Sequence, residues 1–146
     1  MRILVINGPN LNGLGTREPQ HYGVLTLAEI ERRIATRADG LGVEVRFFQS
    51  NHEGALIDEI QAAGDTDGII INGAGLTHTS VPLRDALVAL GKPTVEVHLS
   101  NIYAREPFRH NSLIAPVVLG QISGLREHGY LAALDALVAI LKEGAK

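Results

Sequence analysis

Short apolar runs alternate along the chain with segments whose apolar residues recur every three or four positions. Several of the runs are rich in β-branched residues, as is typical of strands buried on both faces of a parallel sheet. They predict five strands, at residues 3–7, 43–49, 68–72, 94–99 and 115–122.

Four helical patterns lie between or after these runs. Thr26 and Glu29 have the Thr-x-x-Glu spacing of a capping box, and apolar residues then recur at helical intervals up to Ala38. Residues 51–53 can open a second helix. Residues 79–82 can open a third, because a proline such as Pro82 is tolerated in the first turn of a helix. The last helix is expected from about residue 129 to residue 141.

Strands that alternate with helices are arranged most economically as a parallel sheet with helices on both faces, since crossovers are right-handed. We therefore predict an α/β fold of the flavodoxin-like type, a three-layer sandwich whose five parallel strands have the order 2-1-3-4-5. The 146 residues contain no repeat or linker, so we expect a single domain over residues 1–146.

Composition narrows the possible partners. The net charge is -3 with no basic block, so we expect no nucleic-acid partner and no attraction to an anionic membrane. The sequence has no cysteine, which excludes disulfides and thiolate metal sites and fits a reducing compartment. It shows no signal peptide and no long apolar run, so we expect a cytoplasmic protein.

Polar and titratable residues follow four of the predicted strands. In this topology ligands bind outside the carboxyl ends of the strands, near the point where the strand order reverses, so we expect one site there. The candidate residues are Asn10, Arg17 and Tyr22 after the first strand, 50–53 after the second, 72–80 after the third, and Glu96, His98, Leu99, Ser100, Arg105 and Arg109 on or after the fourth.

Glu96 and His98 are the most informative pair. Side chains alternate along a strand, so an acid and an imidazole two positions apart point to the same face. A buried carboxylate is costly unless it is paired, and a carboxylate that fixes a histidine tautomer favours a general acid–base role. Metal binding is the rival reading, but His52, His78 and His98 lack metal-ligand spacing, and we expect no metal.

The connection after the first strand is unusually long, since connections in compact domains have a median of roughly 4–6 residues. We expect an active-site lid at about residues 15–25. Tyr22 alone would be read as a surface aromatic, but an arginine such as Arg17 nearby can favour a phenolate that acts as a base. Arg105 and Arg109 fit either a salt-bridged surface or bidentate contacts to a substrate carboxylate.

Several motifs together resemble the type II 3-dehydroquinate dehydratases. They are Asn7-Gly-Pro-Asn-Leu-Asn12, Gly15-Thr-Arg-Glu-Pro19, Tyr22-Gly23, Gln49-Ser-Asn-His-Glu-Gly54, Thr77-His-Thr-Ser80, Glu96-Val-His-Leu-Ser-Asn101 and Ala104-Arg-Glu-Pro-Phe-Arg109. The resemblance implies anti elimination of water from 3-dehydroquinate through an enolate, giving 3-dehydroshikimate, in the shikimate pathway of aromatic amino acid biosynthesis or in quinate catabolism. It also implies no cofactor and a dodecamer built as a tetramer of trimers.

The resemblance further implies a role for individual residues. By it, Tyr22 is the general base, Arg17 favours its phenolate, and His98 is the general acid that Glu96 orients. Asn10 helps to hold the enolate. The substrate-binding positions are Asn72, His78, Leu99, Ser100 and Arg109, with Asp85 reaching into the site of a neighbouring subunit.

Two other functions remain as alternatives. A flavin- or nucleotide-binding module of the same fold would need a phosphate-cradling loop after the first strand, and Asn7-Gly-Pro-Asn10 lacks the run of Ser, Thr and Gly donors for it. A lysine Schiff-base dehydratase would need a lysine at a strand's carboxyl end. Lys92, Lys142 and Lys146 do not occupy such positions.

Overall fold

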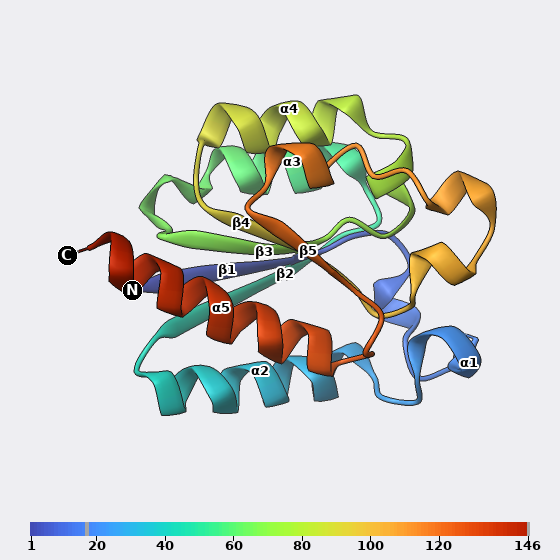
Figure 1. The fold of residues 1–146 in the computed structure, drawn as a ribbon, viewed down its shortest axis with the longest axis horizontal. Coiled ribbons are helices and arrows are strands. Elements are labelled where there is room, and N and C mark those ends of the chain that lie inside the picture. Colours follow the sequence, from blue (N-terminus) through green and yellow to red (C-terminus); the bar gives the residue numbers. More distant parts are fainter. Residues whose placement is uncertain (17, 146) are drawn as a thin grey trace.

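A computed structural model describes residues 1–16 and 18–145 as a parallel sheet between two layers of helices (Figure 1). The strands have the order β2-β1-β3-β4-β5, and every neighbouring pair is parallel. This confirms the predicted flavodoxin-like sheet. The strands are β1 (Arg2–Asn7), β2 (Glu44–Gln49), β3 (Gly68–Asn72), β4 (Thr94–His98) and β5 (Gly120–Ser123).

Two helices cover each face of the sheet, with α2 (Leu27–Leu41) and α5 (His128–Gly144) on one face and α3 (Glu53–Gln61) and α4 (Val81–Leu90) on the other (Figure 1). The capping box predicted at the start of α2 is present, since Thr26 and Glu29 each bind the other's backbone N–H. No helix among residues 1–16 and 18–145 is long and apolar enough to cross a membrane.

The central strands β1 and β3 are buried on both faces, which explains their nearly continuous apolar sequence. Alternate residues of β1 belong to different cores. Ile3 and Val5 pack towards α2 and α5, whereas Leu4 and Ile6 pack towards α3 and α4. The carboxyl ends of β1, β3 and β4 are thereby fixed beside one another.

The prediction of a fifth strand over residues 115–122 is wrong in its first half. Residues Ala115–Val117 form a 3-10 helix, and β5 begins only at Gly120. Pro116 has no N–H to donate to a neighbouring strand, and the N–H groups of Ile114 and Ala115 are bound by the Ser112 hydroxyl instead.

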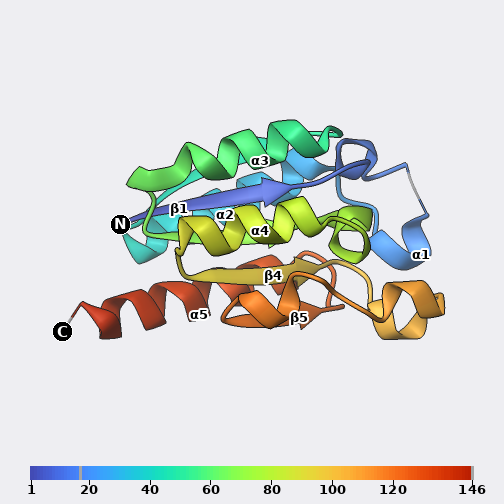
Figure 2. The ribbon, with the colours of Figure 1, turned by 90° about the horizontal axis from the view of Figure 1, so that it is seen from above.

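The long connection after β1 contains two short helices before α2 begins. They are the 3-10 helix η1 (Leu11–Gly13) and α1 (Pro19–Tyr22), and α1 lies beyond the carboxyl ends of the strands (Figure 2). Arg17 lies outside the described residues. The remaining 3-10 helices are η2 (Ala63–Asp65), η3 (Ala74–His78), η4 (Ile102–Ala104), η5 (Pro107–Arg109) and η6 (Ala115–Val117).

The loops after β1 and β3 touch where the strand order reverses. The N–H of Gly8 donates to the Asn72 carbonyl at 2.8 Å, and a Cβ at Gly8 would lie 2.6 Å from the Gly73 carbonyl oxygen. No larger residue fits at position 8 without moving a backbone. This contact sets Pro9 and Asn10 at the edge of the sheet where a ligand site is expected.

Candidate active site

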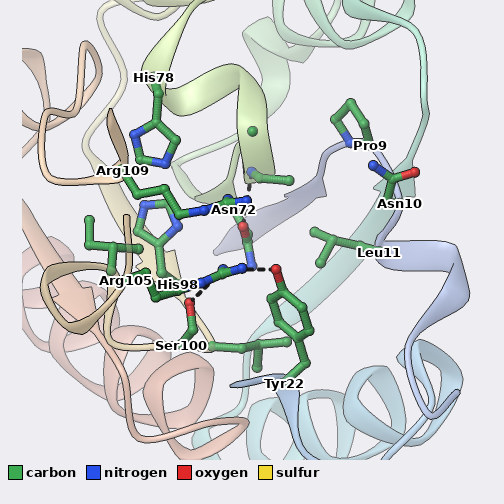
Figure 3. Close-up of a pocket in the computed structure, with 14 residues that line it drawn as sticks. Pro9, Asn10, Leu11, Tyr22, Asn72, His78, His98, Ser100, Arg105 and Arg109 are labelled. Carbon is green, nitrogen blue, oxygen red and sulfur yellow. Dashed lines mark hydrogen bonds between the residues drawn. The ribbon is translucent and has the colours of Figure 1, made fainter. Parts of the chain in front are cut away.

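A cavity of about 160 Å³ opens at the carboxyl ends of β1, β3 and β4 (Figure 3). Eight residues to which the resemblance assigns a role line it, although they come from separate parts of the chain: Asn10, Tyr22, Asn72, His78, His98, Leu99, Ser100 and Arg109. Pro9, Leu11, Ala74, Gly75, Ile102 and Arg105 complete its wall. Residues from these separate segments therefore surround one cavity at the edge of the sheet where a site is expected.

Glu96 and His98 lie side by side on the face of β4 that is turned towards α3 and α4, as their spacing predicts. His98 Nε2 donates to Glu96 Oε2 at 2.8 Å, and the two side chains are 6% and 0% exposed. Val95, Val97 and Leu99 point to the opposite core. Bound in this way, the imidazole has its tautomer fixed and presents its other nitrogen, Nδ1, for chemistry.

The Glu96 carboxylate is held by more than the histidine. The Ser112 hydroxyl donates to Oε1 at 2.6 Å, and the Gln121 amide donates to Oε2. Burial alone would raise the pKa of the Glu96 carboxyl, but the hydrogen bonds from His98, Ser112 and Gln121 outweigh it and lower that pKa below its ordinary value. Glu96 is therefore ionised at neutral pH although it is buried.

Tyr22 faces the cavity from the end of α1 and is 8% exposed. Its hydroxyl accepts a hydrogen bond of 2.8 Å from Arg105 Nη1, and the guanidinium carbon lies 5.2 Å from the ring centroid (Figure 3). Arg105 Nη1 also lies 3.3 Å from Ser100 Oγ, and Nη2 lies 3.7 Å from a carboxylate oxygen of Glu18. A cation buried to 6% exposure therefore touches the phenol oxygen directly.

Asn72 is held from below by a fully buried tyrosine. Its Nδ2 donates to the Tyr130 hydroxyl at 3.0 Å, and that hydroxyl donates to Asn7 Oδ1 at 2.5 Å. Burial raises the pKa of the Tyr130 phenol, so this group stays protonated and keeps its donor. Asn72 Oδ1 accepts from the Ala74 N–H at 3.0 Å. This bond fixes the orientation of the side-chain amide, so that its NH2 group faces Tyr130.

His78 and Arg109 bring nitrogen donors to the opposite wall. His78 Nδ1 donates to the Asn111 carbonyl at 2.9 Å, and its ring stacks on that of His98 at 6.2 Å. Burial lowers the pKa of His78, and the positive charges of His98 and Arg109 act in the same direction. The hydrogen bond to the Asn111 carbonyl raises the pKa but does not outweigh them. Arg109 Nε donates to Glu106 at 2.6 Å, which orients the guanidinium at the cavity wall.

Three other predicted residues are Asn10, Asp85 and Arg17. Asn10 lines the cavity in a left-handed conformation (φ 70°), its backbone N–H held by Asn51 at 2.9 Å. Asp85 is exposed on α4 and does not line the cavity. The predicted role of Arg17 falls on a residue outside the described ranges. Within those ranges, no three His, Asp or Glu side chains gather as a metal site.

Two sets of contacts were not foreseen from the sequence. The sequence suggests a salt-bridged surface or a substrate carboxylate as the partner of Arg105, whereas in the structure Arg105 bonds the Tyr22 hydroxyl. Gln121 is not among the residues predicted for the site. Gln121 sits directly opposite Glu96 in the register of β4 and β5. A correct start for the fifth strand would have pointed to it, because opposite residues in a sheet share a face.

The chain is similar to known proteins over nearly its whole length. A family model described as "Dehydroquinase class II" matches residues 1–138. A protein of Endomicrobium trichonymphae named 3-dehydroquinate dehydratase is 57% identical over 141 residues, 96% of this chain and 99% of the relative. A Neosartorya fischeri protein named catabolic 3-dehydroquinase 1 is 54% identical over 144 residues, 98% of this chain and 96% of the relative.

The backbone fold is also similar to those of solved dehydroquinase structures. The crystal structure of type II dehydroquinase from Butyrivibrio crossotus superposes with a TM-score of 0.92 at 48% identity, covering 94% of this chain and 97% of that one. The type II dehydroquinase from Propionibacterium acnes gives 0.91 at 43% identity, with 94% and 96% covered. The chain belongs to the class II dehydroquinase family.

Proposed function

We propose that this protein is a 3-dehydroquinate dehydratase that eliminates water from 3-dehydroquinate to give 3-dehydroshikimate. The observation that carries the proposal is that Tyr22 and His98, from α1 and β4, line one cavity, each already bonded to a partner suited to its task. An elimination beside a ketone needs a base for the carbon-bound proton and an acid for the departing hydroxyl. One cavity offers both.

Tyr22 is the proposed base, which takes the proton from the carbon next to the ketone. A phenol is a poor base at neutral pH unless a neighbouring cation stabilises its phenolate. Arg105, 2.8 Å from the hydroxyl and 6% exposed, is placed to do so. The resemblance assigns a similar task to Arg17, so the two arginines are proposed to act together.

The negative charge that develops on the ketone oxygen needs a donor already in position, since such preorganised donors supply much of the stabilisation in enolate chemistry. Asn10 is the proposed donor. Its backbone is fixed by Asn51, which leaves the side-chain amide at the cavity wall. A bound water bridging this amide to the enolate oxygen would complete the arrangement.

His98 is the proposed acid, which delivers a proton from Nδ1 to the departing hydroxyl. Glu96 holds Nε2–H and stabilises the imidazolium through its negative charge. The elimination balances without a cofactor: one proton goes to the phenolate, one leaves the imidazolium, and the C–O bond electrons leave with water.

The remaining polar groups suit the rest of the substrate. Arg109 is proposed to bind the carboxylate in the bidentate manner that a guanidinium favours. Asn72 and His78 are proposed to bind the ring hydroxyls together with Ser100 and the backbone at Leu99, all of which line the cavity. We further propose that residues 15–25 close over the bound substrate as a lid, which would exclude water from the charges inside.

We also propose a homo-oligomer, in the form of a tetramer of trimers, in which Asp85 approaches a neighbour's cavity. Val81 and Val88 are 53% and 55% exposed on α4, and Asp85 lies between them on the same side of the helix. Exposed apolar residues flanking one carboxylate favour a partner that covers all three. Light scattering on the eluting protein should give twelve chains of 15.6 kDa per particle.

The direct test is an absorbance assay for enone formation when the purified protein is mixed with 3-dehydroquinate. We expect turnover without added metal or cofactor. Borohydride added with substrate should leave the protein mass unchanged, because no Schiff base is formed. Absence of turnover by folded protein, together with a flavin absorbance band, would instead support the flavin-binding alternative.

A further inference from the structure

A cross-strand neighbour completes the environment of Glu96. Glu96 lies between β3 and β5 in the sheet, opposite Ile71 on one side and Gln121 on the other. Ile71 offers only a hydrocarbon, so Gln121 is the neighbour in register that can donate to the carboxylate. Its amide does so, at the same oxygen that accepts from His98.

The amide of Gln121 is itself fixed from outside. The Tyr103 hydroxyl donates to Gln121 Oε1 at 2.9 Å, while the NH2 group of Gln121 points at Glu96. Tyr103 is 56% exposed on η4, so a chain of hydrogen bonds runs from the surface through Gln121 and Glu96 to His98. A flipped amide would set its oxygen against a carboxylate and is therefore disfavoured.

We propose that Gln121 is a positioning residue for the reaction, whose amide holds the Glu96 carboxylate in the alignment that keeps His98 in one tautomer. The inference rests on the proposed function, because it gives Gln121 a task only if the Glu96–His98 pair is the acid. Gln121 is not among the residues that line the cavity, so its proposed action is through Glu96 alone.

Loss of the Gln121 donor has a predictable sign. A buried carboxylate that loses a donor is protonated more easily, so the pKa of Glu96 rises. Protonated Glu96 no longer accepts equally well from His98 Nε2–H. The other titratable or charged groups near the pair are His98 itself, His78 and Arg109, and none of them can take over the amide's position between Glu96 and Tyr103.

The test replaces Gln121 by methionine, which has a similar length and no donor. Gln121→Leu supplies a second variant that suits an edge strand, and Gln61→Met, at the exposed end of α3, is the matched control. A hydrogen bond to a charged group changes the pKa by about one unit when it is lost. We expect the infrared C=O band of protonated Glu96, identified by its absence from Glu96→Gln, to appear about one pH unit higher in both Gln121 variants.

Kinetics give the second readout. We expect kcat to fall about tenfold in Gln121→Met with KM within about twofold, because the substrate contacts are untouched. In the Glu96→Gln background the same substitution should change kcat by less than about twofold, since Gln121 then has no carboxylate to hold. A loss that is equally large in that background, or an infrared band that does not move, overturns the proposal.

The same variants separate this inference from the proposed function. If Glu96→Gln retains the parent's kcat, the orienting role of Glu96 given under the proposed function is wrong, and the task of Gln121 is lost with it. If Glu96→Gln is impaired while Gln121→Met matches Gln61→Met in kcat and in the infrared titration, only the role of Gln121 is wrong.

Discussion

The two sides of the cavity are built differently: the sheet side consists of Glu96 and His98 on β4, and the lid side carries Tyr22 on α1, within the proposed lid. On the β4 side, His98 belongs to a buried strand, and its partner Glu96 receives three side-chain hydrogen bonds. On the lid side, Tyr22 ends a helix of four residues whose caps, Glu18 and Gly23, have φ values of 35° and 80°. The proposed acid is therefore fixed by the sheet, whereas the proposed base depends on a short segment and on contacts such as that from Arg105.

This difference matters for the proposed chemistry. A group fixed in a sheet keeps its geometry with or without substrate, whereas a group on a short surface helix takes its place only while the helix is docked. Substitutions on the two sides should therefore differ in kind. On the lid side they should alter how the base is formed and delivered, and on the sheet side they should alter proton transfer itself.

The largest effect is expected for Tyr22→Phe, which removes only the hydroxyl. General base catalysis contributes about 10²–10⁴-fold, and Tyr22 is the proposed base, so kcat should fall towards the upper end of that range. Enone formation measures it, and the melting temperature and the affinity for a competitive substrate analogue should stay close to the parent's. Retention of more than a few per cent of activity would sink the base assignment.

A smaller loss, about 10²–10³-fold in kcat, is expected for His98→Ala, since water can replace part of an acid's function. The pH profile of kcat distinguishes this from a packing defect. The alkaline limb, where the acid loses its proton, should disappear from the variant's profile. A profile of unchanged shape would show that His98 is not the acid, whatever the size of the loss.

The sequence was sufficient for features that follow from periodicity alone. The alternation of runs and helices was enough to indicate a parallel sheet covered by helices, and the period of two along β4 was enough to put Glu96 beside His98 before any neighbour was known. Boundaries that depend on one residue were less predictable. Pro116 sits in an apolar stretch that resembles a strand, but it cannot donate to the ladder, and β5 begins only after it, at Gly120.

Contacts between distant segments were beyond sequence reasoning. Arg105 and Tyr22 are 83 positions apart, and which arginine of a basic pair meets the lid depends on how η4 and α1 pack. The partnership of Tyr130 with Asn7 and Asn72 likewise arises only when α5 covers the ends of β1 and β3. Arg17 lies outside the described residues, so its role stays a prediction.

An intermediate effect is expected for Arg105→Met on the lid side. The substitution removes the cation from the Tyr22 hydroxyl, and kcat should fall about 10–100-fold because the phenolate loses one stabilising charge. Arg105→Lys should recover part of this loss, since a cation returns without the fork geometry. Arg126→Met, which removes an exposed arginine that does not line the cavity, is the control. Equal kcat for Arg105→Met and this control would contradict the role of Arg105.

The buried hydrogen bonds of Tyr130 to Asn7 and Asn72, which form the floor of the cavity, should contribute to the free energy of unfolding. Tyr130→Phe leaves Asn7 Oδ1 and Asn72 Nδ2 buried without their shared partner, and each such group costs about 1–3 kcal/mol. We expect unfolding in urea at a lower midpoint with an unchanged slope. Tyr103→Phe, whose hydroxyl is at the surface, is the matched control and should change the free energy of unfolding by less than about 0.5 kcal/mol. Similar losses in the two variants would mean that the buried network does not stabilise the floor.

The smallest effect concerns the pH dependence of stability on the sheet side. Because the folded-state pKa of Glu96 is lowered from 4.5, its ionisation stabilises the fold fully above that value and does so less and less as the pH falls through the folded-state pKa. Glu96→Gln lacks this ionisation, so the gap in melting temperature between parent and variant should be constant from pH 8 to about pH 5 and should narrow in more acidic buffers. Tyr22 offers the contrast, since Tyr22→Phe removes no carboxylate and its gap should stay flat over the same acidic range. A Glu96→Gln gap that widens towards low pH would mean that the carboxylate is held protonated, and the sheet side would then lack the ionised partner on which its rigid acid depends.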